Sequence, residues 1–497
     1  MTDKETTKKE IHAWWGYFAG YEPISAVVLA MLMPLLMEAL GKAAGHVADR
    51  PDLICGSDTE ESKCILISIG SLKISSSSFA YLTVGFSAFA QALSFISVGA
   101  LADYGNLRKQ LLFFCTLLGS LSTLMIMFVT KPSLFWLASL INIFINIFAG
   151  MSIVFYNSYL PLLARHHPSY LKEVGKDTED SHKASGIENP LSTKTLETVT
   201  NRISTFGFII GYVAALLLII ACATFMIAFK NRLEDLMMIK ICIALLGVWW
   251  GIISCLSIMR FKSRAGPAFP KNQSANYFLF SWRKLFCTLK KAKSLPNTFR
   301  YLICYFFFSD GYNTLGSAAV LFCKANINIE TGTLVMALAL SLFFAMLGNF
   351  VMLKIQQIFN IKTKSMLVFM LISLSLLSFY GAIGLISQNY GLRKAWEVLP
   401  MAAYYGSFVG AIQSFSRVLF SEMIPFGEES EFFALYAVTE KGSAWIGPLA
   451  VAIISNYVDG RYGLMFLAIL ILAPLPLLIF GVDSTKGRID CAKFSIK

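Results

Sequence analysis

The sequence predicts an all-α membrane protein with twelve transmembrane helices in two six-helix halves. Three observations support this fold class. The chain of 497 residues is 56% hydrophobic and only 14% charged, whereas a soluble domain carries about 25% charged residues. Its apolar runs are about 20 residues long, which suits helices that cross a bilayer rather than the shorter strands of a barrel. A polar, basic stretch near the middle of the chain divides these runs into two sets of six.

Each of the twelve helices is predicted from one apolar run. The runs are residues 14–40, 79–102, 110–129, 133–160, 203–229, 237–259, 299–323, 331–353, 365–387, 396–424, 432–455 and 463–482. An even number of runs places the tails 1–13 and 483–497 on the same side of the membrane. The loops and tails on that side hold more than twice as many Lys and Arg residues as the opposite loops. The positive-inside rule therefore makes both termini cytoplasmic.

Three polar stretches separate the runs. Residues 41–78 form a loop on the side opposite the termini, and residues 161–202 form a cytoplasmic connector. Residues 261–298 form a cytoplasmic linker between an N-terminal half (14–260) and a C-terminal half (299–482). Two six-helix halves joined by a basic linker resemble the architecture of major facilitator superfamily transporters.

The formal net charge of +12 has a membrane explanation. In a soluble protein it would point to nucleic acid, but here the positive-inside rule accounts for it, so no nucleic acid partner is expected. Within the linker, residues 282–293 (WRKLFCTLKKAK) mix aromatic and basic side chains. We expect this segment to form a helix that lies on anionic lipid.

The chain lacks the motifs of the common enzyme and nucleotide-binding classes. It has no Walker loop, no HExxH motif and no GxSxG motif with catalytic partners. We therefore expect no enzyme, no cofactor and no metal site, and we expect a monomer. Most of the ten cysteines stand singly in apolar runs. Cys55 and Cys64, both in the loop 41–78, can form a disulfide if that loop faces an oxidising compartment.

The loop between the second and third runs, GALADYGNLRK, combines an acid, a glycine turn and two basic residues. We predict that Asp103 caps the N-terminus of a helix in the other half and pairs with a basic residue, Arg108 or Lys109. Such a contact would act as a latch that closes the cytoplasmic side. The alternative is an ordinary basic turn. The corresponding stretch of the second half, residues 354–364, has no Asp.

Acidic residues stand beside helix-breaking residues in the first run of each half. Tyr21 and Glu22 precede Pro23, and Asp310 precedes Gly311. A charge at bilayer depth costs a few kcal/mol, and proline frees backbone carbonyls that need protein or water nearby. This arrangement in corresponding helices predicts a binding or gating site near the middle of the membrane. A structural pair between helices is the alternative.

Further polar residues, from these and other runs, are expected to join this site. They are Tyr156, Asn157, Asn313, Gln413, Arg417, Glu440, Lys441 and Trp445. Arg417 either forms a salt bridge with Glu22 that opens during transport or binds a substrate carboxylate in a bidentate manner. Glu440 and Lys441 either neutralise each other between the halves or take part in transport.

Several segments resemble one known family over nearly the whole chain. They are WWGYFAGYEPISAVVLAMLMPLLMEAL (14–40), TFGFIIGYVAALL (205–217), FFFSDGYNTLGSAAVLFCKANI (306–327) and GAIQSFSRVLFSEMIPFGEESEFFALYAVTEKGSAWIGPL (410–449). With these residues the sequence resembles the autophagy-related protein twenty-two family, fungal vacuolar amino-acid effluxers of the major facilitator superfamily. The resemblance is most specific from the tenth run to the twelfth.

The resemblance implies a protein of the vacuole membrane that exports Leu, Ile or Tyr from the lumen to the cytosol after autophagic breakdown. A zwitterion needs an anionic and a cationic partner in an apolar cavity. Glu22 or Asp310 would meet its ammonium and Arg417 its carboxylate, and proton coupling is possible. The competing hypotheses are transport of another solute, such as a lysolipid or a basic amino acid, and a scaffold for autophagy factors that transports nothing.

Overall fold

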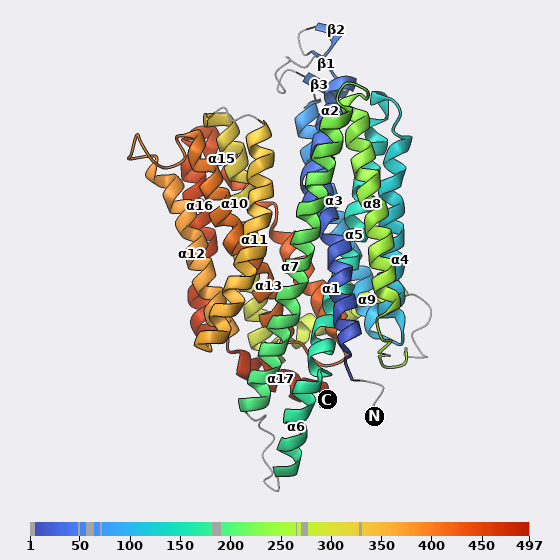
Figure 1. The fold of residues 1–497 in the computed structure, drawn as a ribbon, viewed down its shortest axis with the longest axis vertical. Coiled ribbons are helices and arrows are strands. Elements are labelled where there is room, and N and C mark those ends of the chain that lie inside the picture. The colour runs from blue at the N-terminus through green and yellow to red at the C-terminus, as the bar shows by residue number, and fades with distance from the viewer. Residues whose placement is uncertain are drawn as a thin grey trace.

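The structure is a computed structural model that describes residues 5–47, 50–55, 64–69, 72–180, 190–264, 266–269, 277–327 and 331–496 (Figure 1). It is largely helical, and most helices run along the long axis of the molecule. Both chain ends lie at one end of this axis, which we call the terminal end (Figure 1). The short strands lie at the opposite end, which we call the sheet end.

The first predicted run is one continuous helix in three parts. They are α1 (Lys8–Pro23), a π-helical segment (Ile24–Leu32) and α2 (Met33–Ala44). Pro23 has no backbone N–H, and the helix continues beyond it with hydrogen bonds that span five residues. Such π-helical segments are frequent at functional sites. Glu22 stands immediately before this irregularity.

The remaining helices follow in chain order. In the first part of the chain they are α3 (Ser76–Val98), α4 (Leu107–Leu124), α5 (Phe135–Arg165), α6 (Pro168–Asp180), α7 (Pro190–Phe229) and α8 (Asp235–Met259). The later ones are α9 (Tyr277–Lys290), α10 (Pro296–Ile327), α11 (Thr331–Phe359), α12 (Thr363–Ile383), α13 (Val398–Ser421), α14 (Glu429–Ser443), α15 (Ile446–Tyr457), α16 (Gly460–Leu472) and α17 (Ser484–Ile496). Figure 1 shows α10, α12, α15 and α16 on one side and α3, α4, α5 and α8 on the other. The helix α7 packs against α11 and α13, and α14 packs against α3 and α5, so contacts join the two sides.

Nine helices in the described part of the chain are long and apolar enough to cross a membrane. The predicted runs without such a helix are 299–323, 396–424 and 432–455, which correspond to α10, α13 and α14 with α15. These runs carry many of the charged residues, tyrosines and serines of the candidate site. The last of them is also interrupted at Ala444 and Trp445. The count of twelve spans stays a prediction.

The connector predicted at 161–202 is mostly helical where the structure describes it. The helix α5 continues to Arg165, α6 follows after two residues, and α7 begins at Pro190. Pro168 and Pro190 each occupy the first position of a helix, where the missing N–H and the fixed φ of proline are favourable. Residues 181–189 lie outside the described residues.

The loop predicted at 41–78 contains an antiparallel sheet. Its strands are β1 (His46–Val47), β2 (Arg50–Ile54), β3 (Cys64–Ile69) and β4 (Leu72–Ser75), in the spatial order β2-β1-β3-β4. Cys55 is buried directly after β2. The side chain of Cys64 lies outside the described side chains, so the disulfide between the two stays a prediction.

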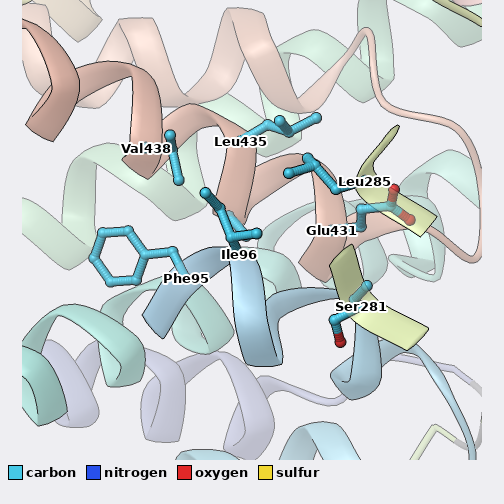
Figure 2. Close-up of a pocket in the computed structure, with 9 residues that line it drawn as sticks. Phe95, Ile96, Ser281, Leu285, Glu431, Leu435 and Val438 are labelled. Carbon is cyan, nitrogen blue, oxygen red and sulfur yellow. The ribbon is translucent and has the colours of Figure 1, made fainter. Parts of the chain in front are cut away.

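The linker helix α9 packs against the protein with one face. Figure 2 shows a small pocket where three helices meet, with Phe95 and Ile96 from α3, Ser281 and Leu285 from α9, and Glu431, Leu435 and Val438 from α14. The indole Nε1 of Trp282 donates a hydrogen bond to Ser97 Oγ at 3.2 Å. Phe286 and Lys290 remain exposed. Contact of residues 282–293 with anionic lipid, through this exposed face, stays a proposal.

Candidate functional site

Arg417 is a buried cation on α13, with 3% of its surface exposed. Its guanidinium Nη1 donates to Asn157 Oδ1 at 2.9 Å, and Nη2 donates to Ser204 Oγ at 2.9 Å. The guanidinium also lies 5.0 Å from the ring centroid of Trp14 and 4.5 Å from that of Phe208. No carboxylate among the described residues forms an ion pair with it. Neutral hydrogen bonds and cation–π contacts therefore hold this charge.

One face of α1 supplies the aromatic surroundings of Arg417. Trp14, Tyr17, Phe18 and Tyr21 recur at intervals of three and four residues, so they share a helix face. Trp14 stacks on the ring of Tyr156 with centroids 4.4 Å apart, and Tyr17 stacks on the same ring at 4.9 Å. The sequence prediction named Tyr21 and Tyr156 only. The helical spacing of the other aromatic residues could have identified them.

Glu22 and Gln413 lie on helices that border this cluster. Glu22 is 8% exposed and its Cβ lies against Gly211 of α7. Within the described part of the chain, its carboxylate makes no hydrogen bond or ion pair. The predicted salt bridge with Arg417 is therefore not formed in this structure. Gln413 lies one turn before Arg417, and its Oε1 accepts a hydrogen bond from Tyr212 on α7 at 3.2 Å.

Asp310 caps the N-terminus of α15. Its Oδ2 accepts from the backbone N–H of Gly447 at 2.7 Å, and its Oδ1 accepts from Thr314 Oγ1 at 3.1 Å. A carboxylate at a helix N-terminus is stabilised by the helix dipole. Asp310 is 2% exposed, and no cation of the described chain pairs with it. The break before α15 was not predicted, although Gly447-Pro448 is typical of a helix start.

Four other predicted site residues lie apart from Arg417. Glu440 and Lys441 pair with each other at 4.0 Å, with 30% and 36% of their side chains exposed. Glu440 Oε2 also accepts a hydrogen bond from Tyr305 at 2.9 Å. Asn313 and Trp445 are exposed on α10 and before α15, and their side chains make no hydrogen bond with the described residues. The structure thus does not bring these four into the Arg417 cluster.

Asp103 makes a second helix cap, at the terminal end. Its Oδ1 and Oδ2 accept from the backbone N–H groups of Ser430 and Glu431, at 2.8 and 2.9 Å, at the start of α14. Arg108 Nη2 donates to Asp103 Oδ1 at 2.6 Å and to Glu429 Oε2 at 3.0 Å. All these residues are buried. These are the contacts that the loop sequence predicts, and the role of the cluster as a latch stays a proposal.

Lys109 is not part of this cluster, which corrects the prediction that grouped it with Asp103. Its Nζ donates to the carbonyl oxygens of Phe261, at 2.6 Å, and Met259, at 3.4 Å, at the end of α8. Adjacent residues on a helix point about 100° apart because a turn contains 3.6 residues. Lys109 and Arg108 therefore face different neighbours.

Two cations that the sequence did not identify complete the cluster. Arg165 Nη1 at the end of α5 donates to Glu429 Oε1 at 3.3 Å. Lys284 Nζ on the linker helix α9 pairs with Glu431 Oε2 at 2.8 Å. Burial alone would lower the pKa of Lys284, but the carboxylates of Glu431 and Asp103 raise it well above its usual value. These contacts join distant segments, so no local pattern indicates them.

A further carboxylate binds across the terminal end. Glu197 on α7 accepts hydrogen bonds from the backbone N–H and the hydroxyl of Thr363 at the start of α12. Asn201, one turn later on α7, donates to Thr363 Oγ1 at 2.6 Å. The second half, whose loop lacks an Asp, thus has its helix capped by an acid of the first half.

The chain matches a known protein family over nearly its whole length. A family model described as "Vacuole effluxer Atg22 like" matches residues 6–492. The chain belongs to this family. It is similar to Autophagy-related protein 22-1 of Neosartorya fischeri, with 29% identity over 98% of this chain and 92% of the relative. It is also similar to Autophagy-related protein 22 of Neurospora crassa, with 30% identity over 98% of this chain and 73% of the relative.

Solved transporters share the fold. The proton:xylose symporter XylE of the major facilitator superfamily gives a TM-score of 0.59, at 12% identity over 97% of this chain and 96% of that one. The Escherichia coli fucose:proton symporter FucP gives 0.58, at 10% identity over 95% and 98%. The human organic anion transporter MFSD10 gives 0.52, at 12% identity over 95% and 99%. Family and fold together identify a multi-pass membrane transporter of a vacuolar effluxer family, not an enzyme.

Proposed function

We propose that the protein exports amino acids of the Leu, Ile and Tyr class from the vacuole lumen to the cytosol by alternating access. The observation that carries this proposal is Arg417, a buried cation without a carboxylate partner among the described residues. A buried charge without a counter-ion is costly and usually functional. A guanidinium binds a carboxylate through two parallel hydrogen bonds. The carboxylate of an amino acid can therefore replace the neutral contacts to Asn157 and Ser204.

The ammonium group of the substrate requires an acid. Asp310 and Glu22 are both buried, and neither pairs with a cation of the described chain. Either can therefore attract an ammonium group as the helices rearrange. The apolar rings of Trp14, Phe18 and Phe208 around Arg417 suit an aliphatic or aromatic side chain.

The contacts at the terminal end bear on the step that releases the substrate. From the excess of Lys and Arg there we infer that this end faces the cytoplasm. In this structure Asp103, Arg108 and Glu429 link segments from opposite parts of the chain at that end. Release of substrate into the cytosol then requires these contacts to separate, which is the role proposed for the latch.

The test is release of amino acids from proteoliposomes preloaded with a mixture of Leu, Ile, Tyr and Lys. The native protein is expected to release Leu, Ile and Tyr faster than protein-free vesicles. Arg417→Gln should lower this rate about tenfold to a hundredfold, because a hydrogen bond to a charged group contributes about 1.5–3 kcal/mol. Arg300→Gln, which removes an exposed arginine of α10, is the control. Normal release by a folded Arg417→Gln protein would contradict the site.

Additional arms of the same experiment separate the alternatives. A pH gradient that accelerates release would indicate proton coupling, for which Glu22 is the candidate acid. Preferential release of Lys would favour a basic amino acid as substrate, and movement of a labelled lysophospholipid would favour a lipid. If no solute moves and only loss of the cytoplasmic loops abolishes function in cells, the scaffold hypothesis is supported.

A further inference from the structure

A cavity of about 250 Å³ lies at the terminal end, apart from the Arg417 cluster. The ends of α5 and α13, the start of α7 and the helix α17 form its walls. Its charged lining residues are Arg165, Glu422 and Arg488. The other lining side chains are mostly apolar, among them Leu196 and Phe426.

Glu422 and Arg488 form only half of the ion pair that their geometry permits. Arg488 Nη2 lies 3.1 Å from Glu422 Oε2, with 9% and 2% of the two side chains exposed. Glu422 Oε1 and Arg488 Nε are buried and have no hydrogen-bond partner in the described part of the chain. A buried polar atom without a partner is unfavourable. A small rotation of either side chain would let a ligand in the cavity provide the missing partner.

Each charged residue that lines the cavity has a counter-ion within the protein. Arg165 pairs with Glu429 at 3.3 Å, and Arg488 pairs with Glu422. A ligand with only an anionic group would offer no partner to Glu422, and a ligand with only a cationic group would offer no partner to Arg488. A zwitterion carries no net charge and presents an ammonium for Glu422 and a carboxylate for Arg488. The ring of Phe426, which lies 5.8 Å from the guanidinium of Arg165, offers an apolar surface to its side chain.

The position of the cavity relates it to Arg417. Glu422 follows Arg417 by five residues on one helical path, which is roughly 7.5 Å toward the terminal end. Cys491 and Ala492 of α17 line the cavity, so the C-terminal helix completes it. We propose that this cavity is a second binding site for a neutral amino acid, on the cytoplasmic side of Arg417. This inference rests on the proposed export function, because it takes the same class of ligand.

The test is equilibrium binding of radiolabelled leucine to the purified full-length protein. Two leucine molecules per chain are expected for the native protein. The double variant Glu422→Gln/Arg488→Gln removes both charges together, and should weaken one of the two sites at least tenfold while it keeps the other. Lys486→Gln, which removes an exposed charge of α17, should keep both. Arg417→Gln should weaken the other site and keep the terminal one, which shows that the variants remain folded.

Ligand analogues test the zwitterion requirement. Leucinamide lacks the carboxylate and 4-methylpentanoate lacks the ammonium, so each should compete for the terminal site at least tenfold more weakly than leucine. Competition by inorganic phosphate as strong as that by leucine would overturn the proposal in favour of an anion site. A single leucine per native chain, or two that persist in the double variant, would also overturn it and leave the export function in place. Leucine bound in the cavity without any release from vesicles would contradict the export function instead.

Discussion

Asp103 and Asp310 use the same contact in different surroundings. Asp103 caps α14 and Asp310 caps α15, and each accepts hydrogen bonds from backbone N–H groups at a helix start. Asp103 also forms an ion pair with Arg108 at 2.6 Å. Among the described residues, the only further hydrogen-bond donor to Asp310 is the hydroxyl of Thr314.

This difference gives the two aspartates different roles: the charge of Asp103 is used within the protein, and the charge of Asp310 is available to a ligand. The guanidinium of Arg108 neutralises Asp103, so this carboxylate stabilises the contact between its own loop and the start of α14. The charge of Asp310 is stabilised by a helix dipole but not neutralised. It can therefore attract an ammonium group. A variant of Asp103 should therefore mainly lower stability, and a variant of Asp310 should mainly slow transport.

Asp103→Asn should have the largest effect on stability. It leaves Arg108 buried with one carboxylate fewer, and breaking a buried ion pair costs about 3–5 kcal/mol. We expect the free energy of unfolding in detergent to fall by about 3 kcal/mol, measured by thermal unfolding. Lys109→Gln in the first turn of α4 is the control. Glutamine can still donate to the carbonyl of Phe261, so the free energy of unfolding should change by less than about 1 kcal/mol. Equal unfolding midpoints of the native protein and Asp103→Asn would refute the comparison.

Asp310→Asn should mainly affect transport. Asparagine can still accept the N–H of Gly447, so the cap is kept in part and stability should fall by only about 1 kcal/mol. Loss of the charge should slow leucine release about tenfold, measured with preloaded vesicles. Thr314→Val keeps the charge and should release leucine at the native rate. A large loss of stability with normal release per folded molecule would assign Asp310 a structural role.

Glu197→Gln tests a cap whose carboxylate forms no ion pair with an arginine among the described residues. The amide still accepts one hydrogen bond from Thr363, and Asn201 still donates to the hydroxyl of that residue. We expect a loss of about 1 kcal/mol in unfolding free energy. Faster hydrogen exchange should be confined to the first turn of α12. A loss as large as that of Asp103→Asn would show that the arginine is not what distinguishes the two caps.

The sequence predicted those contacts that depend on local spacing. The cap by Asp103 follows from the residues of one short loop, and the membrane charges follow from their place in apolar runs. The cap by Asp310 depends on a helix break, and the only sequence signal for that break is the dipeptide Gly447-Pro448 within an apolar run. The absence of an ion pair between Arg417 and Glu22 depends on how two distant helices pack. No local pattern fixes such a distance, and the same holds for Lys284.

Lys284→Gln should have the smallest effect, and its pH dependence tests the sign of the pKa shift. The carboxylates of Glu431 and Asp103, against the effect of burial, raise the pKa of Lys284 in the folded protein. Its contribution to stability is therefore complete below the ordinary lysine pKa of about 10.4 and is lost only as the pH rises through the higher folded value.

Glutamine can still donate a hydrogen bond to Glu431, so the loss in unfolding free energy for Lys284→Gln should be about 1 kcal/mol, and it should be equal at pH 6 and pH 9. The measurement is thermal unfolding of the native protein and the variant at both values. A loss that becomes smaller between pH 6 and pH 9 would mean that Lys284 releases its proton in this range. The carboxylates of Glu431 and Asp103 would then not raise its pKa, which would contradict the prediction. Equal losses would support Lys284 as a charged member of the cluster around Asp103, in contrast to Asp310, which pairs with no cation of the described chain.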